Sequence, residues 1–180
     1  MSTEPPLYER DPEAWQAHLA EGNARQPRKR VSADVILRDN QGRILLVEPL
    51  YKPDWDLPGG MAESNEPPAA AAQRELREEL GIDISVGQLL CVDWVAPHGP
   101  WDDLLAFIFD AGIISDSHAA DLRPRDGELA SYDFCNHDEA ARRLRPYVWR
   151  RASAAVRAIA TRHPQYLQDG YPLVRHGSQR

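Results

Sequence analysis

The chain has 180 residues, 42% of them hydrophobic and 27% charged, a composition that fits one folded domain with short appendages and excludes a disordered or fibrous chain. No apolar run approaches the roughly 20 residues of a membrane span, and the N-terminus lacks the order of a signal peptide, so we expect a cytoplasmic protein with no membrane partner. The net charge of −7 is uneven, because residues 1–122 hold 10 Lys/Arg and 22 Asp/Glu, whereas residues 123–180 hold 11 and 6. A nucleic-acid-binding domain usually carries a basic excess, so a nucleic acid polymer is not expected as a partner, and a small phosphorylated ligand stays open.

The first 27 residues predict a helical extension. Asp11, Pro12 and Glu13 supply an N-cap, a proline at the first helical position and a first-turn acid. The helix is expected to end at Gly22. A homodimer formed through this helix stays open.

The middle of the chain predicts strands joined by turns, with a tight turn over residues 39–42 and an irregular loop over residues 97–101. Strands are expected where apolar residues run or alternate, at 31–37, 44–47, 89–95, 104–109 and 132–135.

Two helices are expected to close the domain. Asn136 and Glu139 form a capping pair, and Pro146 takes the first position of a helix that runs towards His163. Strands mixed with helices, with hairpins as well as crossovers, predict an α/β or α+β fold around a mixed sheet. We place the domain at residues 28–163, followed by a tail at 164–180, and expect Cys91 and Cys135 to be small buried residues.

Residues 57–82 carry the pattern that points to chemistry, LPGGMAESNEPPAAAAQRELREELGI. Prolines are tolerated in the first turn of a helix, so we expect a helix from Pro67 or Pro68 to Leu80, ended by Gly81. Its buried stripe is expected to be formed by Ala69, Ala72, Leu76 and Leu80, which recur at three- and four-residue steps.

Three glutamates lie together on a neighbouring face of this helix. Glu75, Glu78 and Glu79 are spaced i, i+3 and i+4, so their charges repel one another unless a cation compensates. Hard divalent ions such as Mg²⁺ take carboxylate oxygens and are completed by substrate phosphates. The cluster is therefore either half of a metal site or a solvated face that Arg74 and Arg77 neutralise.

The spacing around the glutamates matches a known motif. Gly60 is followed after five residues by Glu66, and after seven more by the run Arg74-Glu75-Leu76-Arg77-Glu78-Glu79-Leu80-Gly81-Ile82. Every fixed position of the Nudix box is present, so the chain resembles the Nudix hydrolases. The preceding hairpin, the approach Trp55-Asp56-Leu57-Pro58-Gly59-Gly60 and the closing helices also look like that family.

The resemblance implies a fold and a metal site. The fold would be an α/β/α sandwich around a mixed β-sheet. Glu75, Glu78 and Glu79 would hold divalent ions, Mg²⁺ or Mn²⁺, with a backbone carbonyl from the Gly59-Gly60 turn as another ligand. Glu66 and Arg74 would form a salt bridge that ties the loop to the helix.

The resemblance also implies an enzyme, a diphosphatase in which water attacks phosphorus in a diphosphate linkage. The proton would pass to Glu78 or Glu79, or to Glu128 in a later loop. The substrate would be a nucleoside diphosphate derivative, either a nucleotide sugar or ADP-ribose-like compound or a nucleoside triphosphate. Trp55 and Trp101 are candidates to stack on a nucleobase, although burial of either ring would equally anchor its loop.

Two other functions stay open on the same fold. A nucleotide-binding sensor without catalysis would more naturally show lost glutamates or a fused DNA-binding domain, and neither is present in the sequence. A diphosphate isomerase would want a cysteine near the start of the box, whereas Cys91 and Cys135 both follow it.

Overall fold

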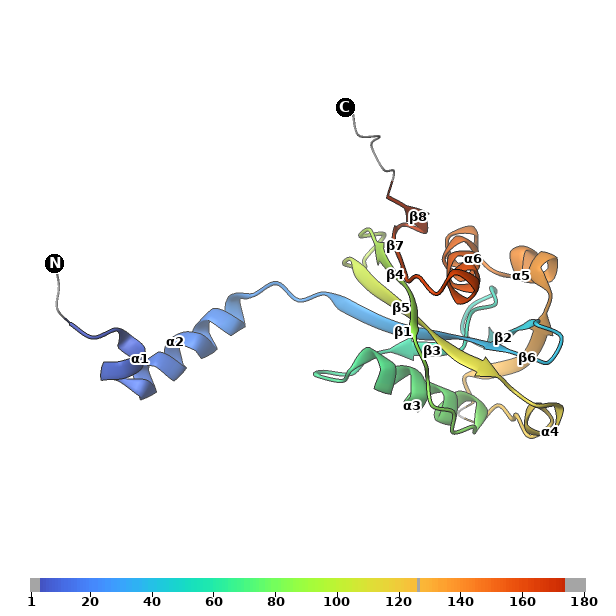
Figure 1. The fold of residues 1–180 in the computed structure, drawn as a ribbon, viewed down its shortest axis with the longest axis horizontal. Coiled ribbons are helices and arrows are strands. Elements are labelled where there is room, and N and C mark those ends of the chain that lie inside the picture. The colour runs from blue at the N-terminus through green and yellow to red at the C-terminus, as the bar shows by residue number, and fades with distance from the viewer. Residues whose placement is uncertain (1–3, 126, 174–180) are drawn as a thin grey trace, which may run out of the picture.

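The computed structural model of the chain describes residues 4–125 and 127–173 (Figure 1). In chain order the elements are α1 (Leu7–Arg10), α2 (Pro12–Arg25), β1 (Arg30–Arg38), β2 (Ile44–Pro49), β3 (Gly59–Met61), α3 (Pro68–Leu80), β4 (Leu89–Val95), β5 (Leu104–Ile113), α4 (Asp116–Ala119), β6 (Leu129–Cys135), α5 (His137–Arg143), α6 (Pro146–Thr161), β7 (Gln165–Gln168) and β8 (Tyr171–Pro172). Among the described residues, no helix is long and apolar enough to cross a bilayer.

The strands form one mixed sheet in the order β6-β2-β1-β5-β4-β7-β8, with β3 paired to β1. The pairs β1–β5 and β4–β7 are parallel, and the other pairs are antiparallel. The mixed sheet predicted from the sequence is therefore confirmed. Because β7 pairs with β4 and β8 pairs with β7, the sheet also includes residues beyond 163.

Helices cover both faces of the sheet, which confirms the sandwich (Figure 1). Strand β1 is buried on both faces, and its side chains alternate between them. Ala33, Val35 and Leu37 pack with α3 in one core cluster, whereas Ile36 packs with α5 and α6 in the other. Asp34 has the same parity as Ile36, so its side chain lies on the α6 face of the sheet.

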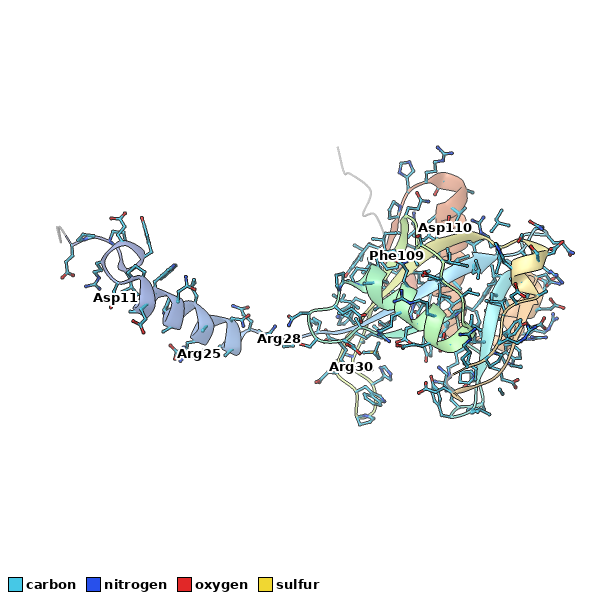
Figure 2. The ribbon with its side chains drawn as sticks, turned by 90° about the horizontal axis from the view of Figure 1, so that it is seen from below. Asp11, Arg25, Arg28, Arg30, Phe109 and Asp110 are labelled. Carbon is cyan, nitrogen blue, oxygen red and sulfur yellow. The ribbon has the colours of Figure 1, made fainter. Side chains whose placement is uncertain are left out.

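The N-terminal helices lie apart from this sandwich. Figures 1 and 2 show α1 and α2 projecting from the domain beyond the start of β1, and neither helix contains a buried residue. The prediction that α2 ends at Gly22 is wrong, since the helix continues to Arg25. It ends before Gln26, which precedes Pro27 and takes the extended conformation that a following proline favours.

Most of the predicted elements are present, several with longer bounds. Strand β4 has the predicted limits, β5 extends to Ile113, and Asn136 and Glu139 form the expected capping box. The loop over residues 97–101 is less irregular than predicted, because His98 and Trp101 pair across a tight turn. The sequence reasoning missed the short elements α1, β3, α4, β7 and β8, which are too brief to carry a periodic pattern.

The two cysteines are buried, as predicted, and both are free thiols. Burial raises the pKa of the Cys91 thiol to about 12. Both side chains belong to the core cluster on the α6 face.

Candidate active site

Helix α3 presents the glutamates of the box. Pro68 lies in its first turn, and Gly81 ends it in the left-handed conformation with φ 71°. The predicted stripe is confirmed at Ala72, Leu76 and Leu80, while Ala71 is buried and Ala69 only partly so. Glu79 is also buried, with 8% of its surface exposed, so this carboxylate is not part of a solvated helix face.

Glu79 is tied to the strand that faces the helix. Its Oε2 accepts a hydrogen bond from the backbone N–H of Gly59 at 3.1 Å. Gly59 belongs to β3 and lies opposite Asp34 of β1. The sheet, α3 and the turn before β3 therefore meet at this carboxylate.

Arg74 is the centre of an ion-pair network on the same helix. Its Nε and Nη2 donate to the two carboxylate oxygens of Glu66 at 3.0 and 3.1 Å. Its Nη1 donates to Glu75 Oε1 at 2.9 Å and to Glu78 Oε2 at 2.8 Å. Nη2 also donates to the carbonyl of Met61 at 3.1 Å. One guanidinium thus joins the loop to the helix and offsets the repulsion between two box glutamates.

The protonation of these groups follows from their neighbours. Burial raises the pKa of Glu75, and the negative charges of Glu78 and Glu128 act in the same direction, while Arg74 opposes them. The hydrogen bonds from Arg74 hold the pKa of Glu66 below its ordinary value. The hydrogen bond to Glu66 raises the pKa of Arg74 further above its ordinary range, so this guanidinium stays charged.

The donor chemistry suits a hard divalent cation. Carboxylate and carbonyl oxygens are its preferred ligands, and the bare face of Gly60 leaves space against the Glu75 carboxylate that a Cβ would fill. Among the described residues, however, no three acidic, histidine or cysteine side chains converge on a metal position as they stand. Glu75 and Glu78 are instead turned to Arg74, so they would have to leave that contact to bind an ion.

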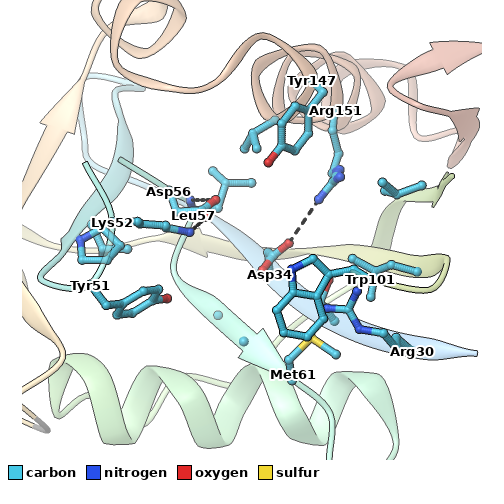
Figure 3. A pocket seen from close by; sticks show the side chains of 18 of the residues that line it. Arg30, Asp34, Tyr51, Lys52, Asp56, Leu57, Met61, Trp101, Tyr147 and Arg151 are labelled. Carbon is cyan, nitrogen blue, oxygen red and sulfur yellow. Dashed lines mark hydrogen bonds and ion pairs between the residues drawn. The ribbon is translucent and has the colours of Figure 1, made fainter. Parts of the chain in front are cut away.

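A pocket of about 360 Å³ opens beside this turn and extends to α6 (Figure 3). Gly59, Gly60 and Glu79 line it. Tyr147 and Arg151 point into it from α6 (Figure 3). Both signs of charge line the pocket: it is bordered by Arg30, Lys52 and Arg151 and by Asp34, Asp56 and Glu79.

Two of these charged groups form a pair at the floor of the pocket. Arg151 Nη1 lies 3.9 Å from Asp34 Oδ2 (Figure 3). Arg151 Nε donates to Asp93 Oδ2 at 3.0 Å. Burial raises the pKa of Asp34 to about 7, Asp56 adds to the rise, and Arg151 opposes it. The Arg151 side chain is only 7% exposed, so its guanidinium is a buried charge.

The two candidate tryptophans differ in position. Trp101 lines the pocket, is 55% exposed and carries the Arg30 guanidinium over its ring at 4.5 Å. Trp55 does not line it. Its ring packs against the core cluster on the α6 face beneath the Arg143 guanidinium, so the structure favours a role in anchoring its loop.

Glu128 directly precedes β6, and its backbone carbonyl accepts a hydrogen bond from Leu50 at 2.7 Å. Its negative charge contributes to the raised pKa values of Glu75 and Tyr51. Tyr51 lines the pocket, so the fold brings the loop of Glu128 near both the box helix and the pocket.

Sequence reasoning missed several residues that line the pocket, and for two of them a signal exists. Asp34 interrupts the apolar strand β1 at a position of core parity. Arg151 follows Val148 by three residues and precedes Ala155 by four, so it lies on the buried stripe of α6. A charge at a core position marks a site more specifically than a basic run does.

The fold and the glutamate helix together define a mixed α/β/α protein with an acidic helix facing a glycine turn. The NUDIX domain family matches residues 28–157, and the chain belongs to this family. Members of the family typically use divalent metal ions.

Individual relatives resemble the chain over shorter stretches. The chain is 42% identical over 72 residues to the CTP pyrophosphohydrolase of Escherichia coli K12, covering 38% of this chain and 48% of that protein. It is 48% identical over 46 residues to the 8-oxo-dGTP diphosphatase of Proteus vulgaris, covering 26% and 39%. The matched stretches thus span less than half the length of these curated relatives.

The fold is shared with solved structures. The MutT protein of Methanosarcina mazei Go1 superposes with a TM-score of 0.61 at 21% identity, covering 76% of this chain and 99% of that one.

Proposed function

We propose that the protein is a metal-dependent hydrolase that cleaves the diphosphate linkage of a nucleoside diphosphate derivative. The observation that carries the proposal is the complete set of box residues, with Glu75, Glu78 and Glu79 on one helix beside a pocket that Gly59 and Gly60 line. The relatives named as a CTP pyrophosphohydrolase and an 8-oxo-dGTP diphosphatase support the reaction class.

The metal would be Mg²⁺ or Mn²⁺. Glu75, Glu78 and Glu79 would hold it, with a backbone carbonyl of Gly59 or Gly60. When bound, such an ion neutralises charge on the diphosphate and lowers the pKa of a bound water. Arg74 and Glu66 would hold the loop and the helix in register.

The protein supplies the base and the binding surface. The oxygen of a water molecule bonds to one phosphorus of the diphosphate, and the bond from that phosphorus to the bridging oxygen breaks. The other phosphate group leaves with the bridging oxygen and the part of the substrate attached to it. The proton of the water passes to a carboxylate, for which Glu78, Glu79 and Glu128 are candidates. Trp101 would stack on the base of the substrate, because its exposed ring faces the pocket.

Two alternatives have less support. A sensor without catalysis would not require all three glutamates. A diphosphate isomerase would require a reactive cysteine at the pocket, but Cys91 and Cys135 are buried in the core and neither lines it.

The test is a panel of substrates incubated with the full chain and Mg²⁺. Nucleoside triphosphates, nucleotide sugars, ADP-ribose and dinucleoside polyphosphates are each incubated, and the products are resolved by mass. Cleavage within the diphosphate linkage in ¹⁸O-labelled water should place the label on one phosphate product. Absence of any metal-dependent cleavage, or isomerised products without label, would contradict the proposal.

A further inference from the structure

A buried acceptor and a buried donor lie side by side in the pocket, outside the glutamate helix. The side chain of Asp34 is 14% exposed and that of Arg151 is 7% exposed, and both line the pocket. Asp34 comes from β1 and Arg151 from α6, so the packing of α6 on the sheet brings them together (Figure 3).

Their hydrogen-bonding capacity is only partly used within the protein. The separation of 3.9 Å between Arg151 Nη1 and Asp34 Oδ2 is too long for a hydrogen bond. In the described part of the chain, the Arg151 side chain makes one hydrogen bond, from Nε to Asp93, and the Asp34 carboxylate accepts none. Both side chains line the pocket, so their remaining donor and acceptor atoms are available to a ligand there.

The position of the Arg151 side chain is fixed by residues that do not line this pocket. Asp93 is fully buried, and its other oxygen, Oδ1, accepts a hydrogen bond from the backbone N–H of Gly170 at 2.9 Å. The turn between β7 and β8 therefore orients Asp93, and Asp93 orients the guanidinium. Little conformational freedom would be lost when Arg151 meets a ligand.

The charges select against a phosphate at this point. The Asp93 carboxylate already pairs with the Arg151 guanidinium, and Asp34 adds a further acidic group, so no net positive charge is left at this point to attract a phosphate. A neutral group that offers a hydrogen-bond donor beside an acceptor would satisfy both Asp34 and Arg151. The edges of nucleobases have this pattern.

The walls of the pocket favour a flat ring over a sugar. Trp101 and Tyr147 line the same pocket and are 55% and 37% exposed. Aromatic rings stack on a base, whereas sugar hydroxyls need only polar partners. Asp34 lies on the α6 face of β1, and the box helix lies on the other face. The diphosphate and the base would thus be held by different layers of the fold.

We propose that Asp34 and Arg151 read the hydrogen-bonding edge of the nucleobase, which makes them specificity-determining residues for a substrate that carries a base. This inference rests on the proposed function. It narrows the substrate class to nucleotides recognised through the base and not only through phosphate or sugar.

The test compares substrates within one enzyme preparation. For the full chain, kcat/KM is measured with Mg²⁺ for ATP, GTP, CTP, UTP and ribose 5-triphosphate, which has no base, and for UDP-glucose. The readout is the kcat/KM of the best nucleotide divided by the kcat/KM of ribose 5-triphosphate. This ratio does not depend on how much of a preparation is folded. The same measurements are made on two variants, Asp34→Asn and Arg151→Lys. Both substitutions approximately keep the shape of the side chain, and Arg151→Lys also keeps its charge.

We expect the wild-type chain to prefer one base, and the preference over ribose 5-triphosphate to fall about tenfold or more in each variant, mainly through KM. Asp133→Asn and Arg157→Met serve as controls, since these exposed residues lie outside the pocket, and the ratio should not change. A wild-type enzyme that cleaves ribose 5-triphosphate as well as any nucleotide would overturn the inference. So would ratios in both variants within twofold of wild type.

Failure of the proposed function gives a different result. If the chain cleaves none of the panel, binding of the four nucleoside 5′-monophosphates without metal is measured by calorimetry for wild type and Asp34→Asn. If wild type binds one base more tightly than the others and the Asp34→Asn variant does not, the base-reading role is supported. Equal affinities in the two proteins, or no binding to wild type, overturn it.

Discussion

Gly60 lies directly against the carboxylate of Glu75. A Cβ placed on Gly60 would be 2.5 Å from both Glu75 Cδ and Oε1, closer than side-chain atoms approach one another. The neighbouring Gly59 has a different constraint, because its φ is 137° and a Cβ there would be 2.3 Å from the carbonyl oxygen of Ala33. One glycine therefore makes room for a flexible carboxylate, and the other makes room for backbone.

Gly60→Ala should lower activity far more than stability. The Glu75 side chain can rotate away from the new methyl group, so the fold survives, but the carboxylate leaves its position. A shift of about 1 Å can cost on the order of 10²-fold in rate. We expect kcat with Mg²⁺ to fall by about that factor, with a melting temperature near that of wild type.

Two other glycines serve as controls for this variant. Gly59→Ala should unfold the protein more readily, because backbone cannot rotate away. Gly22→Ala, in an open helical position, should leave kcat unchanged and stabilise the helix slightly. Full activity in Gly60→Ala would show that the position of Glu75 is unimportant.

Glu78→Gln and Glu79→Gln should each reduce turnover by about 10²-fold or more while the chain stays folded. Gln at position 79 can still accept the hydrogen bond from Gly59, and Glu78 is 53% exposed, so neither change removes a core contact. Turnover is measured against Mg²⁺ concentration, with the exposed Asp83→Asn as control. A rate near wild type in either glutamate variant would remove that residue from the site.

Arg74 and Glu66 should be coupled in stability. Arg74→Ala removes contacts to Glu66, Glu75, Glu78 and the Met61 carbonyl, whereas Glu66→Gln weakens only one of them. Arg74→Ala should therefore lower the free energy of unfolding more than Glu66→Gln does. The double variant should lower it by less than the sum of the two single changes. Urea unfolding of the four proteins measures this, and strict additivity would contradict the coupling.

The same pair predicts a pH dependence. Because Arg74 lowers the pKa of Glu66 in the folded state, the stabilisation is present above the unfolded value of 4.5 and is lost as pH falls through the folded value. The stability difference between wild type and Glu66→Gln should therefore shrink as the pH falls from 7 to 3. A difference that stays constant over this range would mean that the pKa of Glu66 is not lowered.

Glu128→Gln tests the general base. If Glu128 accepts the proton, kcat should fall by about 10²–10⁴-fold with little change in the Mg²⁺ requirement. The matched control is Glu63→Gln, a glutamate in the exposed loop before α3. An unchanged kcat would assign the proton-accepting role to the box helix.

The elements with strong local signals were readable from sequence. The capping box at Asn136 and Glu139, the end of α3 at Gly81 and the limits of β4 depend on neighbouring residues, so local chemistry defines them. The spacing from Gly60 to Ile82 likewise identified the family. The strands β3 and β7 could not be predicted, because three or four residues form a strand only when a partner strand lies beside them.

The sequence by itself determined that three glutamates share a helix and that an arginine is spaced to neutralise them, because helical periodicity places those side chains. Only the tertiary structure decided that Glu79 is buried against Gly59, that Trp55 packs on the core and that Trp101 faces the pocket. The pairing of Asp34 with Arg151 also depends on it. These residues are 117 positions apart in the chain, and only the packing of α6 on the sheet brings their charges together.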